Sequence, residues 1–157
     1  MRSPVSRSDT AERILDIAEK LVQTRGYNGF SYADIASELA VTKASLHYHF
    51  AAKAELGRRL IERYADNFAG ALRAIDGDAS GTTDKLEQYV AIYADVLRAG
   101  RMCLCGMLAA DQATLPPPIR AGLRRFFDLN ETWLEAALAQ GRAAGALRFA
   151  EPPLERA

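Results

Sequence analysis

Side chains that can bind a phosphate or a base edge gather between Thr42 and Lys53. Residues 42–50 run Thr-Lys-Ala-Ser-Leu-His-Tyr-His-Phe, and a lysine follows at position 53. At helical spacing Leu46 and Phe50 share one face, which predicts that they are buried together. The other side chains are small, basic or able to hydrogen-bond, as a helix that enters a DNA groove requires. The segment therefore predicts a recognition helix.

Two histidines lie in this segment, but their spacing does not suit a metal site. His47 and His49 are two residues apart, so on a helix they point about 200° away from each other. Zinc needs ligands that converge on one point. We expect no metal and no cofactor, with one histidine at the edge of the groove and the other in a structural position.

The predicted recognition helix needs two further helices to position it. Ser8 or Asp9 can cap a first helix, and Gly26 can end it because glycine accepts a left-handed conformation. Ser31 can cap a second helix, with Asp34 as the acid of a capping box. The three helices are expected to share one apolar core, made of Ile14, Leu21, Phe30, Ile35, Leu39, Val41, Leu46 and Phe50.

A tight turn is predicted to join the second and third helices, and helical signals continue to the end of the chain. Ala40 and Val41 form this turn, and Thr42 can cap the third helix. Further helices are expected over about 53–75, from Thr82 or Thr83 to Gly100, over about 101–113, and after the prolines at 116–118. The predicted fold is all-α. A three-helix head with a helix-turn-helix occupies residues 1–53, and a helical ligand-binding and dimerisation body occupies residues 54–157.

The composition fits a globular protein with a local basic patch. The 157 residues carry a formal net charge of zero, and residues 1–60 hold nine Lys and Arg against seven Asp and Glu. A local patch can bind phosphate without an extreme overall charge. No apolar run reaches the roughly 18 residues of a membrane span, and the first residues do not resemble a signal peptide. With only two cysteines in the chain, we expect a cytoplasmic protein.

Four stretches of the chain resemble the tetracycline-repressor (TetR) family of bacterial transcription regulators. They are residues 11–18 (Ala-Glu-Arg-Ile-Leu-Asp-Ile-Ala), 26–31 (Gly-Tyr-Asn-Gly-Phe-Ser), 34–36 (Asp-Ile-Ala) and 41–56, which include the predicted recognition helix. The resemblance implies a homodimer that binds a palindromic operator in double-stranded DNA. It also implies that a small-molecule inducer in the body releases the protein from DNA, so that the expected function is repression.

The resemblance assigns DNA contacts to particular residues. Bases or groove walls would be contacted from the third helix, by Lys43, Ala44, Ser45 and Tyr48, with Thr42 at its start. Phosphates would be contacted by Ser31, His47 and Lys53. Helix geometry agrees independently, because Ala44 and Tyr48 lie opposite the edge formed by Leu46 and Phe50. The family more often has Tyr at position 47 and Gly at position 40, which implies a pH-sensitive phosphate contact and a slightly different turn.

The family usually has two further helices beyond the seventh, and in the family these build the dimer interface. The chain ends at Ala157 without them. Either the chain is a truncated or partly observed product, which we favour, or it dimerises in another way; the homodimer is implied by the resemblance alone.

A mostly apolar ligand is expected in the body. The candidate lining combines aromatic, sulfur-containing and polar side chains, namely Phe68, Tyr89, Tyr93, Cys103, Met107, Phe127, Asn130 and Trp133. Each of these is individually compatible with simple core packing. By the resemblance, ligand binding would shift the fourth helix, which begins at Lys53 and reaches this region.

Cys103 leaves three interpretations open. It is expected near the start of the sixth helix beside Arg101, where the cation and the helix dipole would favour a reactive thiolate. It could therefore sense an electrophile or oxidant, serve a thiol-based redox sensor or enzyme, or simply pack with Cys105 in the core. No Ser/His/Asp set, paired carboxylate motif or glycine-rich phosphate loop is present, so an enzyme is not expected. A dimerisation or anti-repressor module that has lost DNA binding is the remaining alternative.

Overall fold

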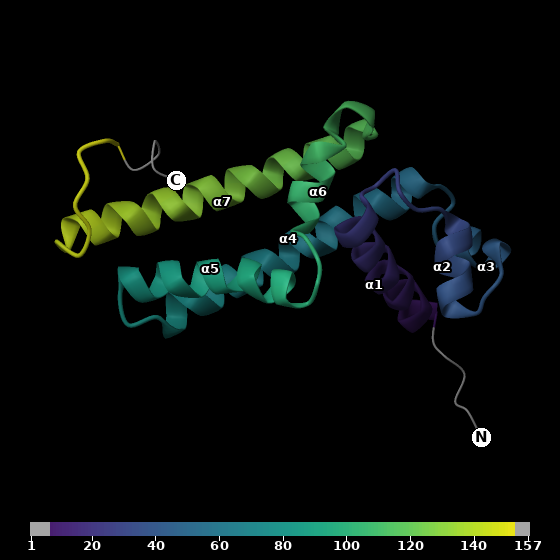
Figure 1. Cartoon of the computed structure of the whole chain (residues 1–157), viewed down its shortest axis with the longest axis horizontal. Helices are drawn as coiled ribbons and strands as arrows, with labels where there is room; N and C mark the ends of the chain where they lie inside the picture. Colours follow the sequence, from purple (N-terminus) through teal and green to yellow (C-terminus); the bar gives the residue numbers. More distant parts are fainter. Residues whose placement is uncertain (1–6, 153–157) are drawn as a thin grey trace, which may run out of the picture.

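The computed structural model describes residues 7–152, and all regular structure in this range is helical. Three helices form a head at one end of the molecule, and the longer helices of the body extend away from it (Figure 1). The helices are α1 (Arg7–Arg25), α2 (Tyr32–Leu39), α3 (Lys43–His49), α4 (Lys53–Asp78), α5 (Thr82–Arg98), α6 (Leu104–Ala110) and α7 (Pro117–Ala143), with a short 3₁₀ helix, η1 (Gln112–Thr114). The predicted all-α class is confirmed.

The head packs α1, α2 and α3 around a single apolar core. The predicted core residues are buried except Val41, which is half-buried against the same core. Gly26 ends α1 as predicted: its φ is +78°, and its N–H donates to the carbonyl oxygen of Val22 at 2.9 Å. The predicted start was wrong, because Ser8 and Asp9 lie inside α1, which already includes Arg7.

Side chains cap α2 and α3 as predicted. The backbone N–H of Ser31 donates to Oδ2 of Asp34 at 2.7 Å, which is the acidic half of the capping box. At the next helix, the N–H of Ser45 donates to Oγ1 of Thr42 at 3.2 Å. Between them Ala40 adopts φ +54° and ψ +44°, a left-handed conformation in which the Cβ is strained. The turn therefore keeps a backbone shape that glycine would adopt more easily.

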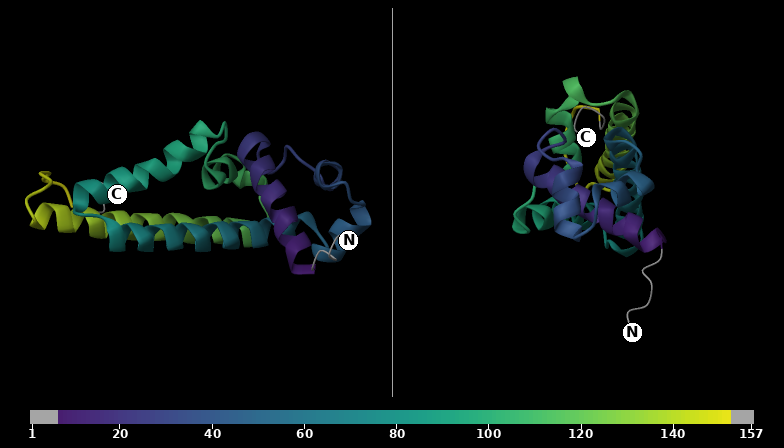
Figure 2. Two further views of the ribbon diagram at one scale, coloured as in Figure 1. Left: turned by 90° about the horizontal axis from the view of Figure 1, so that it is seen from below. Right: turned by 90° about the vertical axis from the view of Figure 1, so that its right-hand side faces the viewer.

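The long helix α4 connects the head to the body and runs side by side with α7 (Figure 2, left). The two backbones approach closely at Gly122 of α7, where a Cβ atom would lie 2.7 Å from Cγ2 of Ile61. α5 lies against the same pair at one end and diverges from it at the other (Figure 2, left). None of the 17 residues of α5 is buried.

Three predicted boundaries in the body were wrong. α4 continues to Asp78, past the expected end near residue 75. Neither Thr82 nor Thr83 caps α5, since both are helical and the N–H of Ser80 donates to the Asp84 carboxylate at 2.8 Å instead. The sixth helix is shorter than expected, because residues 101–103 are not helical.

Candidate nucleic-acid interface

One face of α3 carries the predicted base-contacting side chains. Leu46 is 1% exposed and anchors the helix in the head, whereas Tyr48 is 63% exposed on the opposite side. Lys43 and Ala44 are exposed as well, and Ser45 is half-buried. The apolar residues therefore fix the orientation of α3 and leave a short polar surface outward.

A groove of about 410 Å³ runs between the start of α2 and α3. Its lining brings together four of the predicted contact residues, Ser31, Lys43, His47 and Lys53, with Phe30, Tyr32 and Ala33. Two lysines and a histidine thus face one depression beside the exposed side of α3. Lysine and serine side chains are among the groups that contact phosphate oxygens in protein–DNA complexes.

Lys53 contributes to this groove and also fastens the head internally. Its ammonium donates to the carbonyl oxygen of Tyr27 at 2.6 Å and to that of Phe30. The same nitrogen lies 4.7 Å and 4.1 Å from the centroids of the two aromatic rings. Burial lowers the pKa of Lys53, while Asp34 and Asp111 oppose this shift. The sequence did not reveal this structural role.

His47 is held in a defined orientation by a backbone contact. Its Nδ1 lies 3.1 Å from the carbonyl oxygen of Ala51, and its ring packs against that of Tyr32 with centroids 4.7 Å apart. A carbonyl oxygen can only accept, so Nδ1 carries the proton of this hydrogen bond. Tyr32 is fixed in turn, since its hydroxyl donates to the carbonyl oxygen of Phe50 at 2.9 Å. Burial raises the pKa of Tyr32 to about 12.

Ser31 reaches the groove from the start of α2, but its polar groups are already engaged. Its hydroxyl donates to Oδ2 of Asp34 at 2.8 Å, beside the backbone donation to the same oxygen. These contacts lower the pKa of Asp34, the backbone N–H contributing most. A phosphate at this position would compete with Asp34 for the Ser31 hydroxyl.

The predicted ligand-binding residues fall into two groups in the body. The hydroxyls of Tyr89 and Tyr93 both donate to Oδ1 of Asn130, at 2.8 Å and 3.2 Å. The Asn130 amide donates to the carbonyl oxygen of Phe126 at 2.8 Å, and the Trp133 ring stacks on Tyr89 at 5.4 Å. With Phe68, these residues form a packed aromatic cluster in which the two tyrosine hydroxyls and Asn130 bond to one another.

The remaining candidates lie outside the aromatic cluster. Phe127 is 41% exposed, whereas Phe126 before it is 1% exposed, because the next residue on a helix is rotated by about 100°. Met107 is half-buried in α6. Cys103 is also half-buried and immediately precedes α6.

The side chain of Arg101, two residues before Cys103, bonds to α1. Its guanidinium donates to Oε1 of Gln23 at 3.1 Å. Cys103 and Cys105 are both free thiols. Burial raises the pKa of Cys105, which keeps this thiol protonated. Burial also raises the pKa of Tyr64, and the neighbouring Cys103 and Cys105 act in the same direction.

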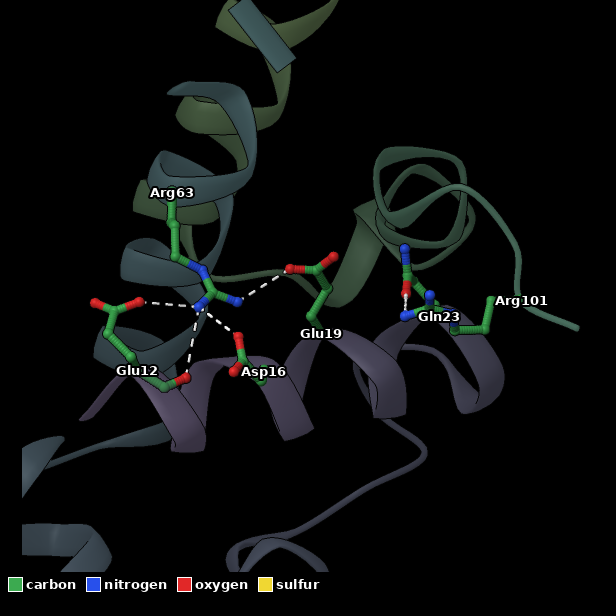
Figure 3. A network of polar contacts seen from close by, with 6 residues as sticks. All are labelled: Glu12, Asp16, Glu19, Gln23, Arg63 and Arg101. Atoms are coloured by element: carbon green, nitrogen blue, oxygen red, sulfur yellow. Dashed lines mark hydrogen bonds and ion pairs between the residues drawn. The ribbon is translucent and has the colours of Figure 1, made fainter. Parts of the chain in front are cut away.

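Polar contacts between the head and the body were not predicted from the sequence. Arg63 of α4 donates to carboxylates of three α1 residues, Glu12, Asp16 and Glu19, at 3.0, 2.8 and 3.1 Å (Figure 3). The carboxylate of Asp111 accepts the backbone N–H of Tyr27 at 2.8 Å. The sequence signal for this contact was the row of acids on α1, spaced four and three residues apart. Their partner, Arg63, lies 44 or more positions away in the sequence.

Two negative observations apply to residues 7–152. No helix in this range is both long enough and apolar enough to cross a bilayer. No cluster of three or more His, Cys, Asp or Glu side chains there could hold a metal ion.

Comparisons with known proteins agree with this architecture. A profile of the bacterial regulatory proteins of the tetR family matches residues 14–60, which cover most of the head and the start of α4. A negative transcriptional regulator of a biofilm operon, IcaR from Staphylococcus epidermidis, is 32% identical over 79 residues. That match covers 50% of this chain and 42% of IcaR, so the chain aligns with less than half of its curated relative.

Two solved structures match nearly the whole chain. A TetR transcriptional regulator from Legionella pneumophila is 34% identical, with a TM-score of 0.85, over 98% of this chain and 81% of its own. A TetR-family regulator from Agrobacterium tumefaciens is 28% identical, with a TM-score of 0.92, over 96% of this chain and 80% of its own. With the head, the helix order and these matches in agreement, the chain belongs to the TetR family of bacterial regulatory proteins.

Proposed function

We propose that this protein is a ligand-responsive transcriptional regulator, acting as a repressor, whose head binds a palindromic operator. The observation that carries the proposal is the orientation of α3, which buries Leu46 and exposes Lys43, Ala44 and Tyr48 on one face. A recognition helix placed in the major groove reads base edges with such side chains. Residues 1–53 would form the DNA-binding domain and residues 54–157 the ligand-binding domain, and two copies would bind the two half-sites.

The groove beside α3 supports the proposed phosphate contacts. An ammonium group has three donors, and Lys53 uses two of them on the carbonyl oxygens of Tyr27 and Phe30. These two bonds leave the third donor unused, and Lys53 lines the groove. Lys43 and His47 line the same groove, so a phosphate seated there would meet three basic side chains from α3 and α4.

His47 leaves one ring nitrogen for the proposed contact. Its Nδ1 hydrogen is engaged by the carbonyl oxygen of Ala51, so only Nε2 can meet a phosphate in the groove. Nε2 donates to a phosphate only when both ring nitrogens are protonated.

Selection of bound sequences from a random DNA pool tests the proposed function directly. The wild-type chain should enrich a palindrome, and Tyr48→Ala should shift the enriched sequence because it removes a group that faces the bases. Arg73→Ala is a matched control, since Arg73 is an exposed basic residue of the body. A wild-type chain that enriches no sequence would contradict the proposal.

The inducer is the less defined part of the proposal. If the aromatic cluster binds a ligand, the ligand must displace contacts that already satisfy Tyr89, Tyr93 and Asn130. Movement there would reach the head through α4, which carries Phe68 at the cluster and begins at Lys53. A ligand shifts this equilibrium only by its difference in affinity for the two states.

An electrophile is a second candidate for the inducer, favoured by the position of Cys103. This free thiol is half-buried where the chain enters α6, next to the Tyr64 hydroxyl, whereas Cys105 is fully buried. Treatment with iodoacetamide should modify Cys103 and lower DNA affinity, and Cys103→Ser should abolish both effects. Unchanged DNA affinity after complete modification would exclude the thiol as a sensor. We propose no catalytic role for any residue, and we propose that the protein acts in the cytoplasm, where the DNA is.

A further inference from the structure

A cavity of about 220 Å³ lies where the head meets the body. Its walls come from three helices and a loop: Glu19 and Gln23 of α1, Tyr64, Asn67, Phe68 and Ala71 of α4, Ile92 and Val96 of α5, and Arg101. We call it the junction cavity. It adjoins the aromatic cluster, because Phe68 belongs to both, but Tyr89, Asn130 and Trp133 do not line it. Pockets for drug-sized ligands have about 300–1,000 Å³, so the junction cavity suits a smaller molecule.

The lining divides into an apolar part and a charged end. Phe68, Ile92 and Val96 supply apolar surface, whereas Gln23 is a polar residue only 2% exposed. The Gln23 amide oxygen accepts the hydrogen bond of Arg101 at 3.1 Å (Figure 3). A ligand of matching chemistry has a short hydrocarbon part and one polar group.

The charge of the ligand's polar group follows from the contacts that Glu19 and Arg101 already make. The carboxylate of Glu19 is paired with Arg63 at 3.1 Å, and Arg63 is only 19% exposed. A cationic ligand group that took Glu19 from Arg63 would leave the largely buried guanidinium with less negative charge around it, which costs free energy. Arg101, in contrast, is bonded to the neutral amide of Gln23. A carboxylate can replace that amide and form a stronger, two-pronged pair with the guanidinium.

The cavity wall also contains the contacts that fix α1 on the body. Gln23 is held twice from the α5–α6 loop: by the Arg101 side chain, and by the backbone N–H of Met102, which donates to the Gln23 carbonyl oxygen at 3.1 Å. A ligand that takes Arg101 removes one of these contacts and occupies the space between α1 and α5. α1 belongs to the head, so occupancy changes how firmly the head is held.

We propose that the junction cavity binds a small amphipathic carboxylate, with its carboxylate on Arg101 in place of Gln23 and its hydrocarbon part against Phe68, Ile92 and Val96. Binding loosens α1 from the α5–α6 loop and thereby lowers the affinity of the head for DNA. This regulatory consequence rests on the proposed DNA-binding function, whereas the binding step does not.

Calorimetric titration of the whole chain without DNA tests the binding step. The probes are hexanoate, 1-hexanol and hexylamine, which share a chain length and differ in charge. Hexanoate should bind at least about tenfold more tightly than hexanol, because hydrogen bonds to charged groups are the stronger ones. No measurable hexanoate binding, equal binding of hexanoate and hexanol, or tightest binding of hexylamine would overturn the proposal.

Three variants locate the binding. Arg101→Gln should reduce hexanoate binding to the level of hexanol, and Ala71→Phe should weaken both by filling the cavity that Ala71 lines. Arg98→Gln is the matched control, because Arg98 is 71% exposed and pairs with Asp95. Circular dichroism must show that each variant is folded. Hexanoate binding that persists in folded Arg101→Gln and Ala71→Phe would also overturn the proposal.

A second titration separates this inference from the proposed function. Hexanoate should release the wild-type chain from its selected DNA and should not release Arg101→Gln. A chain that binds hexanoate but no DNA would retain the junction site and refute the regulatory consequence. A chain that binds DNA with the same affinity when saturated with hexanoate would refute that consequence as well.

Discussion

In the head, α3 directs Lys43 and Tyr48 outward, whereas in the body the hydroxyls of Tyr89 and Tyr93 turn inward to Asn130. The side chains of Lys43 and Tyr48 are exposed to solvent, but the body hydroxyls bond to one another and to Asn130. Polar side chains of similar type thus lie on the surface in one region and pack internally in the other. Whether a polar side chain is exposed or internal depends on which face of its helix carries the buried apolar residues.

The largest expected effect comes from a substitution in the core of the body. Phe126 is 1% exposed and contacts the rings of Phe68 and Tyr64, whereas its neighbour Phe127 is 41% exposed. Phe126→Ala should lower the free energy of unfolding by about 3–5 kcal/mol, the usual cost of a cavity of this kind. Phe127→Ala should cost much less. Urea unfolding followed by circular dichroism measures both, and equal costs would contradict the assigned orientation of α7.

A smaller effect is expected from the polar centre of the aromatic cluster. Asn130→Leu removes the acceptor shared by the hydroxyls of Tyr89 and Tyr93. The two hydroxyls lie 3.1 Å apart and can still bond to each other, so one donor is left without a partner. The expected loss is about 1–3 kcal/mol. A stability gain in the same unfolding experiment would show that the network is not formed in solution.

The head offers a substitution that should stabilise it. Ala40 is exposed and left-handed, with φ at +54°, and this conformation costs an L-residue about 1 kcal/mol relative to glycine. Ala40→Gly should therefore raise the free energy of unfolding by up to about 1 kcal/mol, reduced by the greater freedom of glycine in the unfolded chain. Thermal unfolding measures the change. A lower melting temperature would mean that the turn is not left-handed.

The smallest effect concerns pH at the corner between α4 and α5. Bonds from Lys85 and Trp133 lower the pKa of Asp76. A carboxyl with a lowered folded pKa stabilises the fold above its ordinary value near 4 and loses this contribution as the pH falls through the lowered value. Trp133 is the single tryptophan, so its fluorescence should change at acid pH before global unfolding. Asp76→Asn should remove this early step; an identical early step in Asp76→Asn would assign it to another group.

The sequence predicted the head in more detail than the body because the head depends on local signals. The caps at Ser31 and Thr42 act over three residues, and the burial of Leu46 and Phe50 follows from helical spacing. At the start of α5 the predicted cap failed because a competing local group acts, since Asp84 accepts from Ser80. The buried and exposed faces of α3 could therefore be predicted from a segment of twelve residues.

The body and the contacts between the two regions could not be predicted in the same way. The partners of Asn130 lie 37 and 41 positions away, and Arg101 bonds to a residue 78 positions away. Nothing in the local sequence pattern distinguishes a tyrosine that hydrogen-bonds to a distant asparagine from one that lines an open pocket. For the same reason, the structural role of Lys53 and the salt bridges of Arg63 appear only in the folded chain.

The dependence of DNA affinity on salt tests the central claim, namely that the groove beside α3 holds phosphate. On the selected DNA, we would compare the wild type with Lys53→Met, which keeps an apolar chain against Tyr27 and Phe30, and with Arg73→Met as the control. Melting curves ensure that only folded protein is compared. Lys53→Met should reduce the slope of log affinity against log salt by about one per bound head, with no change for Arg73→Met. Equal slopes for folded Lys53→Met and the wild type would show that Lys53 does not bind a phosphate in this groove.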